Sequence, residues 1–174
     1  LYDGTVSEMN LAALNQAVIA GVLKTQNPDV NLVSAPVVAK EKGIQISTTR
    51  QEKTGVFDAY IKVTMVTDKR ERSVAGTCFS DGKPRFIQIK GINMEAEVGQ
   101  HMLYITNQDK PGFIGRFASL LGAAGINIAT FNLGRRAAGE DAIALVEVDE
   151  AISDEVIGRV AALEGVVQAK RLSF

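Results

Sequence analysis

The fold is decided by the stretch Leu103-Tyr104-Ile105-Thr106-Asn107-Gln108-Asp109-Lys110-Pro111-Gly112. Its first half is apolar and β-branched, which is typical of a strand, and its second half has the polar residues of a turn. Proline is favoured at the first position of a helix, so we expect a helix to begin at Pro111. The stretch therefore predicts a strand that passes through a polar turn directly into a helix.

The residues that follow continue this pattern to the end of the chain. Apolar residues recur at helical spacing from Phe113 to Leu121, and Gly122 and Gly125 close that helix. A second helix is predicted from Ser153 to Leu163, and strands are predicted over residues 127–134, 142–148 and 166–174. The resulting order, β-α-β-β-α-β, is that of the ferredoxin-like split unit.

Polar residues at the predicted strand ends suggest a binding site. We expect Asn107, Asp109 and Asn127 to lie near one end of the same sheet, beside the N-terminus of the first helix. A carboxylate would suit the helix dipole and the amide of Asn127, and an ammonium group would suit Asp109. Taken singly, each residue is better explained as a helix cap or a turn residue. Together they predict a site for a small zwitterion.

The first part of the chain predicts a separate α+β domain. A helix capped by Ser7 is expected to end near Asn27-Pro28, and a shorter one to lie within residues 31–43. Strands are predicted over residues 44–49, 58–67, 72–79 and 85–90. A polar stretch at residues 95–99 suggests the boundary, so we predict domains at 1–98 and 99–174.

Two segments carry a resemblance to known families. Asn107-x-Asp109-x-Pro111-Gly112, followed by Gly125-Ile126-Asn127-Ile128-Ala129, resembles an ACT domain, the amino-acid-sensing module of metabolic enzymes. Residues 30–44 resemble the intervening domain that precedes the ACT domain in long-form D-3-phosphoglycerate dehydrogenases. The resemblance implies the fold class α+β, with an intervening α+β domain followed by a ferredoxin-like βαββαβ ACT domain.

The resemblance also implies a function. It implies the regulatory C-terminal part of an NAD-dependent enzyme that oxidises 3-phosphoglycerate, the first step of L-serine biosynthesis. In that family, ACT domains pair side by side and L-serine binds at the junction, so a homodimer or homotetramer is expected. Carried over by position, the effector ligands are Asn107, Asp109 and Asn127. The family more often has His or Tyr at the first position and Asn at the second, so the site could be weakened, altered in preference or without an effector.

No nicotinamide site is expected within this chain. It contains no Gly-x-Gly-x-x-Gly sequence at a strand-to-helix turn. The chain begins with Leu1, and Tyr2-Asp3-Gly4 resembles the end of a strand. We therefore expect the first domain to be N-terminally truncated, with the NAD-binding catalytic part missing, and this fragment to be inactive by itself.

Catalytic and metal-binding residues are not predicted either. His101 is the only histidine and Cys78 the only cysteine, and nothing in the pattern brings them together. The chain has no Cys-x-x-Cys, His-x-x-x-His or calcium-loop spacing.

Charge and hydropathy limit the kinds of partner that the chain is expected to bind. The 19 Lys and Arg against 20 Asp and Glu give a net charge of -1, which predicts no attraction to nucleic acid. No apolar run approaches the ~18 residues of a membrane span. A single cysteine suits a reducing cytoplasm. Lys83 and Arg85 could bind an anion, although a solvated strand edge is favoured, and Arg135-Arg136 is expected to be solvated at a hairpin.

One alternative from another enzyme class remains. The β chain of an iron–sulfur L-serine dehydratase also joins a similar intervening domain to an ACT domain. An iron–sulfur cluster needs cysteine ligands, which usually lie on the other part of that enzyme. The single Cys78 therefore disfavours this alternative without excluding it.

Overall fold

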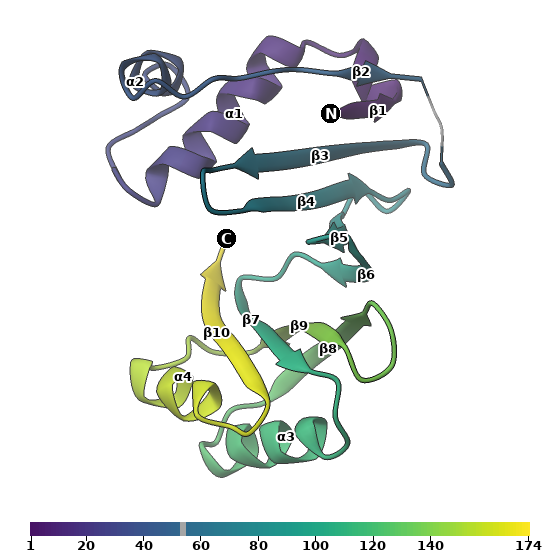
Figure 1. Cartoon of the computed structure of the whole chain (residues 1–174), viewed down its shortest axis with the longest axis vertical. Helices are drawn as coiled ribbons and strands as arrows, with labels where there is room; N and C mark the ends of the chain where they lie inside the picture. Colours follow the sequence, from purple (N-terminus) through teal and green to yellow (C-terminus); the bar gives the residue numbers. More distant parts are fainter. Residues whose placement is uncertain (53–54) are drawn as a thin grey trace. The chain divides into compact units, whose positions relative to one another are not determined.

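The computed structural model describes residues 1–52 and 55–174, which form two compact units (Figure 1). The first unit is Leu1–Val63 and the second is Thr64–Phe174. The predicted domain boundary at 98/99 is a different division, based on sequence pattern, and stays a prediction. No helix within the described residues is long and apolar enough to cross a membrane.

The first unit combines helices with a small group of strands. Its elements are β1 (Tyr2–Gly4), the 3-10 helix η1 (Thr5–Glu8), α1 (Leu11–Lys24), α2 (Ala35–Glu41), β2 (Arg50–Gln51) and the first part of β3 (Ala59–Val66). Strand β1 pairs in parallel with β2 and antiparallel with β3. Small residues let α1 and α2 approach closely, and the buried core between them is Ala20, Leu23, Val30, Ala35 and Ala39.

Two predictions for this unit are wrong. Asn10, not Ser7, caps α1, because its side chain accepts a hydrogen bond from the backbone N–H of Ala12 at 3.1 Å. Residues 44–49 do not form the predicted strand. The strand in this region, β2, contains only Arg50–Gln51. The alternating Ile44 and Ile46 are 42% and 51% exposed, so they bury little of the apolar surface that would stabilise a strand.

The second unit begins with three antiparallel strands. These are β4 (Glu71–Cys78), β5 (Pro84–Ile89) and β6 (Ile92–Glu97). Strand β6 was not predicted, and it overlaps the polar stretch that suggested a boundary. The turn before it has positive φ angles at Lys90 (51°) and Gly91 (77°), as tight hairpins require. Lysine rarely adopts this conformation, so the sequence did not indicate a hairpin here.

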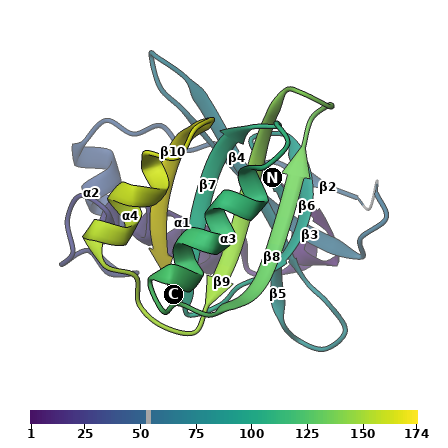
Figure 2. The same ribbon diagram turned by 90° about the horizontal axis from the view of Figure 1, so that it is seen from below.

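The rest of the second unit has the predicted β-α-β-β-α-β order. Its elements are β7 (His101–Gln108), α3 (Phe113–Ala123), β8 (Ile128–Arg135), β9 (Asp141–Val148), α4 (Asp154–Ala161) and β10 (Val166–Ser173). The sheet order is β10-β7-β9-β8, and Figure 2 shows α3 and α4 in front of this sheet. Both the ferredoxin-like arrangement and the α+β class are therefore confirmed.

Apolar residues of the sheet and the two helices form the main core. Phe117 of α3 is fully buried, and its ring lies 5.9 Å from that of Phe113 and 5.8 Å from that of Phe131 on β8. Ser153 caps α4 as predicted, since its hydroxyl accepts from the N–H of Val156. These contacts fix the positions of both helices on one face.

Helix α3 begins two residues later than predicted. Its N-cap is Gly112, with a φ of 88°, and Pro111 lies in the preceding turn. This left-handed conformation is available to glycine at little cost. No side chain caps the helix, so neither Asn107 nor Asp109 has the capping role that was considered for it.

Strand β6 packs closely against β8 within the second unit. A Cβ atom at Gly134 would lie 2.7 Å from the carbonyl oxygen of Asn93 and 2.9 Å from a methyl carbon of Ile92. Nearby, Ala96, Met102 and Leu145 form a buried cluster. Gly134 is therefore needed for the close approach of the two strands.

Replacing Gly134 by alanine should destabilise the protein. The added methyl group meets backbone, which cannot move aside freely, so we expect a loss of about 1–3 kcal/mol in the free energy of unfolding. Gly158→Ala is the control, because Gly158 lies in α4 with nothing within 4 Å of its Cβ position. It should stabilise by up to ~1 kcal/mol. Urea denaturation would measure both, and equal stabilities would contradict the packing argument.

Candidate functional site

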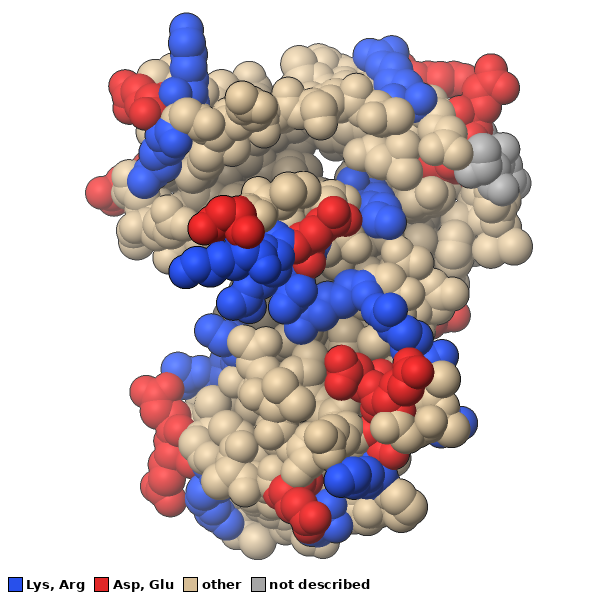
Figure 3. Space-filling model, viewed as in Figure 1, with Lys and Arg blue, Asp and Glu red and all other residues tan. Residues whose placement is uncertain are grey.

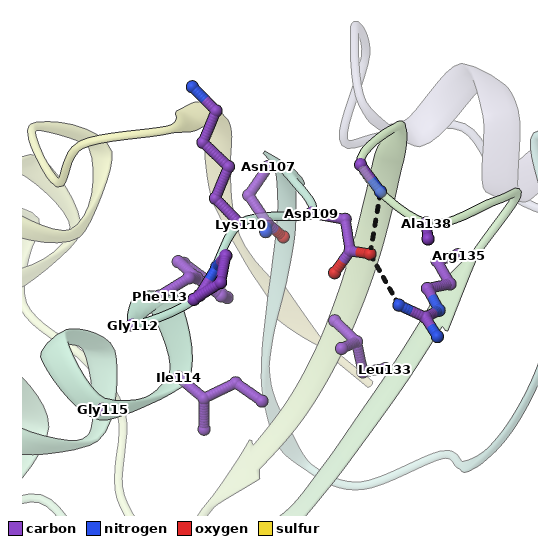
Figure 4. Close-up of a pocket in the computed structure, with 12 residues that line it drawn as sticks. Asn107, Asp109, Lys110, Gly112, Phe113, Ile114, Gly115, Leu133, Arg135 and Ala138 are labelled. Carbon is purple, nitrogen blue, oxygen red and sulfur yellow. Dashed lines mark hydrogen bonds and ion pairs between the residues drawn. The ribbon is translucent and has the colours of Figure 1, made fainter.

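A pocket of about 480 Å³ lies where β7 ends and α3 begins (Figure 4). Its walls come from the turn at residues 107–112, the first residues of α3, and the β8–β9 hairpin. The pocket thus forms around the stretch that decides the fold.

Asn107 is held in the pocket wall by the central strand of the sheet. It lies on β7, opposite Ala142 of β9 and Val166 of β10, and is only 2% exposed. Its Nδ2 donates to the carbonyl oxygen of Gln108 at 2.8 Å, while its buried Oδ1 has no hydrogen-bond partner within the described residues. An unsatisfied buried acceptor costs about 1–3 kcal/mol. A donor from the pocket would remove that cost.

Asp109 supplies the negative charge of the pocket. Its Oδ2 accepts from Nη1 of Arg135 at 2.7 Å and from the backbone N–H of Gly139 at 3.2 Å. These hydrogen bonds, chiefly that from Arg135, lower the pKa of Asp109 below its usual range. The backbone N–H of Asp109 also donates to the carbonyl oxygen of Glu140 at 2.8 Å. Asp109 is therefore ionised at neutral pH and tied to the β8–β9 hairpin.

The N-terminus of α3 is the third element of the pocket. Ile114 and Gly115, in its first turn, line the cavity, and no side chain caps the helix. The first backbone N–H groups of a helix lack partners within it and carry partial positive charge. This end of α3 can therefore receive a negatively charged group.

Asn127 does not lie at this end of the sheet. Strands β7 and β8 both pair antiparallel with β9, so they run in the same direction, and α3 returns the chain to the opposite end before β8 starts. Ile128 is opposite Val148, whereas Arg135, seven residues on, is opposite Ala142. At ~3.3 Å per residue the two ends of β8 are about 20 Å apart.

The expectation that Asn127 joins Asn107 and Asp109 within one chain is therefore wrong. Its Nδ2 instead donates to Oδ2 of Asp149 at 2.7 Å. Whether Asn127 binds an effector in an assembly stays a prediction.

Lys83 and Arg85, the candidate anion site, both have acidic partners. Nζ of Lys83 lies 2.6 Å from Glu97, and Nη2 of Arg85 lies 2.7 Å from Asp81. The hydrogen bonds from Arg85 lower the pKa of Asp81 to about 2. Figure 3 shows one face on which many Lys and Arg side chains gather, with Asp and Glu side chains beside them. These pairings disfavour anion binding, which stays a prediction.

Within the described residues, no group of His, Cys, Asp and Glu side chains could hold a metal ion.

The sequence did not predict a role for Arg135 in the pocket, because this side chain was expected to be solvated at a hairpin. Nothing local in the sequence indicates that it reaches Asp109, 26 positions earlier.

Comparison with known families identifies the class of these domains. Residues 101–165, which include most of the ferredoxin-like sheet and the pocket, match the ACT domain family. Residues 1–90 match the family described as D-3-phosphoglycerate dehydrogenase intervening domain. The chain therefore belongs to the D-3-phosphoglycerate dehydrogenase intervening-domain family, and an ACT domain follows.

Curated relatives share this pair of domains. The chain is 31% identical to the D-3-phosphoglycerate dehydrogenase of Bacillus subtilis, over 99% of this chain and 33% of that protein. The Methanocaldococcus jannaschii enzyme of the same name is also 31% identical, over 92% and 30%. A probable L-serine dehydratase β chain of Bacillus subtilis is 24% identical, over 90% and 71%. The chain thus spans about a third of the length of these dehydrogenases.

The pKa of Asp109 should depend on Arg135. Arg135→Gln removes the main cause of the low pKa, so the value should rise toward that of an ordinary carboxyl group. Arg136→Gln removes the same charge from the neighbouring residue and should leave it unchanged. Carboxyl-detected NMR titration would measure the pKa of Asp109 in each variant.

The low pKa of Asp109 also makes stability depend on pH. Because the folded-state pKa is depressed, any stability from this pair is present above the ordinary Asp pKa and is lost as the pH falls through the depressed value.

Proposed function

We propose that this chain is the regulatory and oligomerisation part of a D-3-phosphoglycerate dehydrogenase and that it senses L-serine. The observation that carries the proposal is the buried Oδ1 of Asn107, which has no hydrogen-bond partner within the described residues and lies in the pocket wall near ionised Asp109. The names of the relatives support the enzyme class.

The pocket suits the groups that L-serine carries. Its ammonium group can donate to Asp109, and either the ammonium or the hydroxyl can donate to Oδ1 of Asn107. The N-terminus of α3 offers N–H groups and a favourable dipole to the carboxylate. Each charged group of the ligand would thus find a partner of opposite charge.

An assembly of two copies would give Asn127 a place in the site. Strand β8 is an edge of the sheet, and the unpaired N–H and C=O groups of an edge strand can pair with another chain. If two copies pair antiparallel through β8 about a two-fold axis, the start of one β8 meets the end of the other. Asn127 of the second copy would then lie near Arg135 and Asp109, at the junction.

Catalysis is assigned to another part of the parent protein. That part would bind NAD and oxidise 3-phosphoglycerate to 3-phosphohydroxypyruvate, with the present domains adjusting its activity in the cytoplasm. NAD titration of this chain should therefore show no binding, and micromolar affinity would contradict this division of roles.

The dehydratase alternative rests on one comparison. The chain spans 71% of the dehydratase β chain, a larger share than of the dehydrogenases, but the identity falls to 24%. Iron analysis of the full-length gene product, purified together with any partner subunit, separates the two proposals. The assembled iron–sulfur dehydratase would contain iron and the dehydrogenase would not.

L-Serine binding should depend on Asp109. Asp109→Ala removes the acceptor for the ligand ammonium, and losing a hydrogen bond to a charged group costs ~1.5–3 kcal/mol, or roughly ten- to hundredfold in affinity. Calorimetric titration of the wild-type chain and the variant would measure the change. Asp81→Ala, which removes a carboxylate outside the pocket, is the control and should bind as the wild type does. Equal binding by Asp109→Ala would show that this assignment is wrong.

The chain should assemble through its edge strands. At tens of micromolar, light scattering should give at least twice the 18.6 kDa mass of one chain. A monomer under these conditions would contradict the proposed junction.

A further inference from the structure

We propose that Arg135 binds the α-carboxylate of the effector, and that the Asp109–Arg135 ion pair selects neutral zwitterionic amino acids. The inference rests on the proposed function, because it concerns the ligand of the same pocket. It gives Arg135 a direct contact with the ligand.

The ion pair leaves atoms on both residues available. Both hydrogen bonds to the Asp109 carboxylate go to Oδ2, and among the described residues none is made to Oδ1. Figure 4 shows this second oxygen directed away from Arg135, on the side of α3. Arg135 uses only Nη1 in this pair and its side chain is 56% exposed, so its other N–H groups can reach a ligand.

A zwitterion can lie along this pair, with its positive group beside Asp109 and its negative group beside Arg135. Its ammonium would donate to Oδ1 of Asp109 and to Oδ1 of Asn107. Its carboxylate would accept from the free N–H groups of Arg135 instead of those at the start of α3. Both sets of hydrogen bonds are charge-assisted. The pair does not have to break, since the ligand uses atoms that the pair leaves open.

The surroundings of the pair favour a neutral ligand side chain. Ile114 and Leu133, which are 50% and 38% exposed, flank the cavity. Among the described lining residues the charged ones are Asp109, Lys110 and Arg135, and Figure 4 shows the Lys110 side chain extending away from the other two. A basic amino acid would therefore bring a second positive charge, for which the described lining residues offer no acidic partner besides Asp109.

The neighbouring arginine provides a matched control. Nη2 of Arg136 donates to the carbonyl oxygen of Lys90 at 3.3 Å, and Arg136 does not line the pocket. Arg135→Gln and Arg136→Gln change the charge equally, so general electrostatic effects are the same in both.

Calorimetry with three ligands tests the inference on the whole 174-residue chain. The ligands are L-serine, ethanolamine, which lacks the carboxylate, and glycerate, which lacks the ammonium. L-Serine should bind Arg135→Gln ten- to hundredfold more weakly than wild type, and Arg136→Gln within about twofold of it. Ethanolamine should bind Arg135→Gln at least as tightly as wild type, since it has no carboxylate for Arg135 and the substitution removes a positive charge near its ammonium. Thermal unfolding of both variants verifies that they fold.

Each result has a definite meaning. If Arg135→Gln binds L-serine as wild type does, Arg135 does not hold the carboxylate, while the proposed function stands. If the wild type binds glycerate as tightly as L-serine, selection of zwitterions is wrong. If the wild type does not bind L-serine, the proposed effector site and this inference both fail. If Arg135→Gln does not fold, Arg135→Lys takes its place, because lysine keeps the charge but lacks the planar set of N–H donors. Unchanged L-serine affinity would then show that the free N–H groups of Arg135 do not hold the carboxylate.

Discussion

The hydrogen bonding of β7 on both sides is the constraint on which the site depends. Strand β7 lies between β9 and β10, so its backbone is fixed along its whole length. Its apolar residues, among them Leu103 and Ile105, are fully buried. The same pairing carries polar Asn107 into the pocket wall, where its buried Oδ1 has no hydrogen-bond partner among the described residues. The fold thus accepts an unfavourable polar group near the point where β7 leaves the sheet.

The turn after β7 and the start of α3 determine the shape of the pocket. The left-handed conformation of Gly112 separates the turn from the helix and leaves the first N–H groups of α3 without a side-chain cap. The hydrogen bonds of Asp109 with Arg135 and Gly139 hold the β8–β9 hairpin opposite them. In a site of this kind, the side chains that can contact a ligand lie on turns, and a rigid sheet holds those turns in position.

The sequence predicted the architecture well because periodicity is a local property. Helical spacing after Pro111 and alternation around Leu145 correctly predicted the β-α-β-β-α-β order. Long-range relations were less accessible. The direction of the α3 crossover, which separates Asn127 from Asp109, follows from strand pairing and cannot be deduced from residue types alone. The contact between Arg135 and Asp109 depends on the same pairing, through the hairpin that follows β8.

The charge of the pocket explains why the ligand class should be narrow. The side chain of Asp109 is only 20% exposed, and a carboxylate in such a place needs a positive partner. Arg135 supplies it, so the pair has no net charge. A zwitterionic ligand preserves that balance, because its positive group pairs with Asp109 and its negative group pairs with Arg135. An amine or a hydroxy acid would instead leave one unbalanced charge in a partly enclosed space, where water screens it poorly. The acidic residue therefore need not abolish an amino-acid site, provided that its basic partner also contacts the ligand.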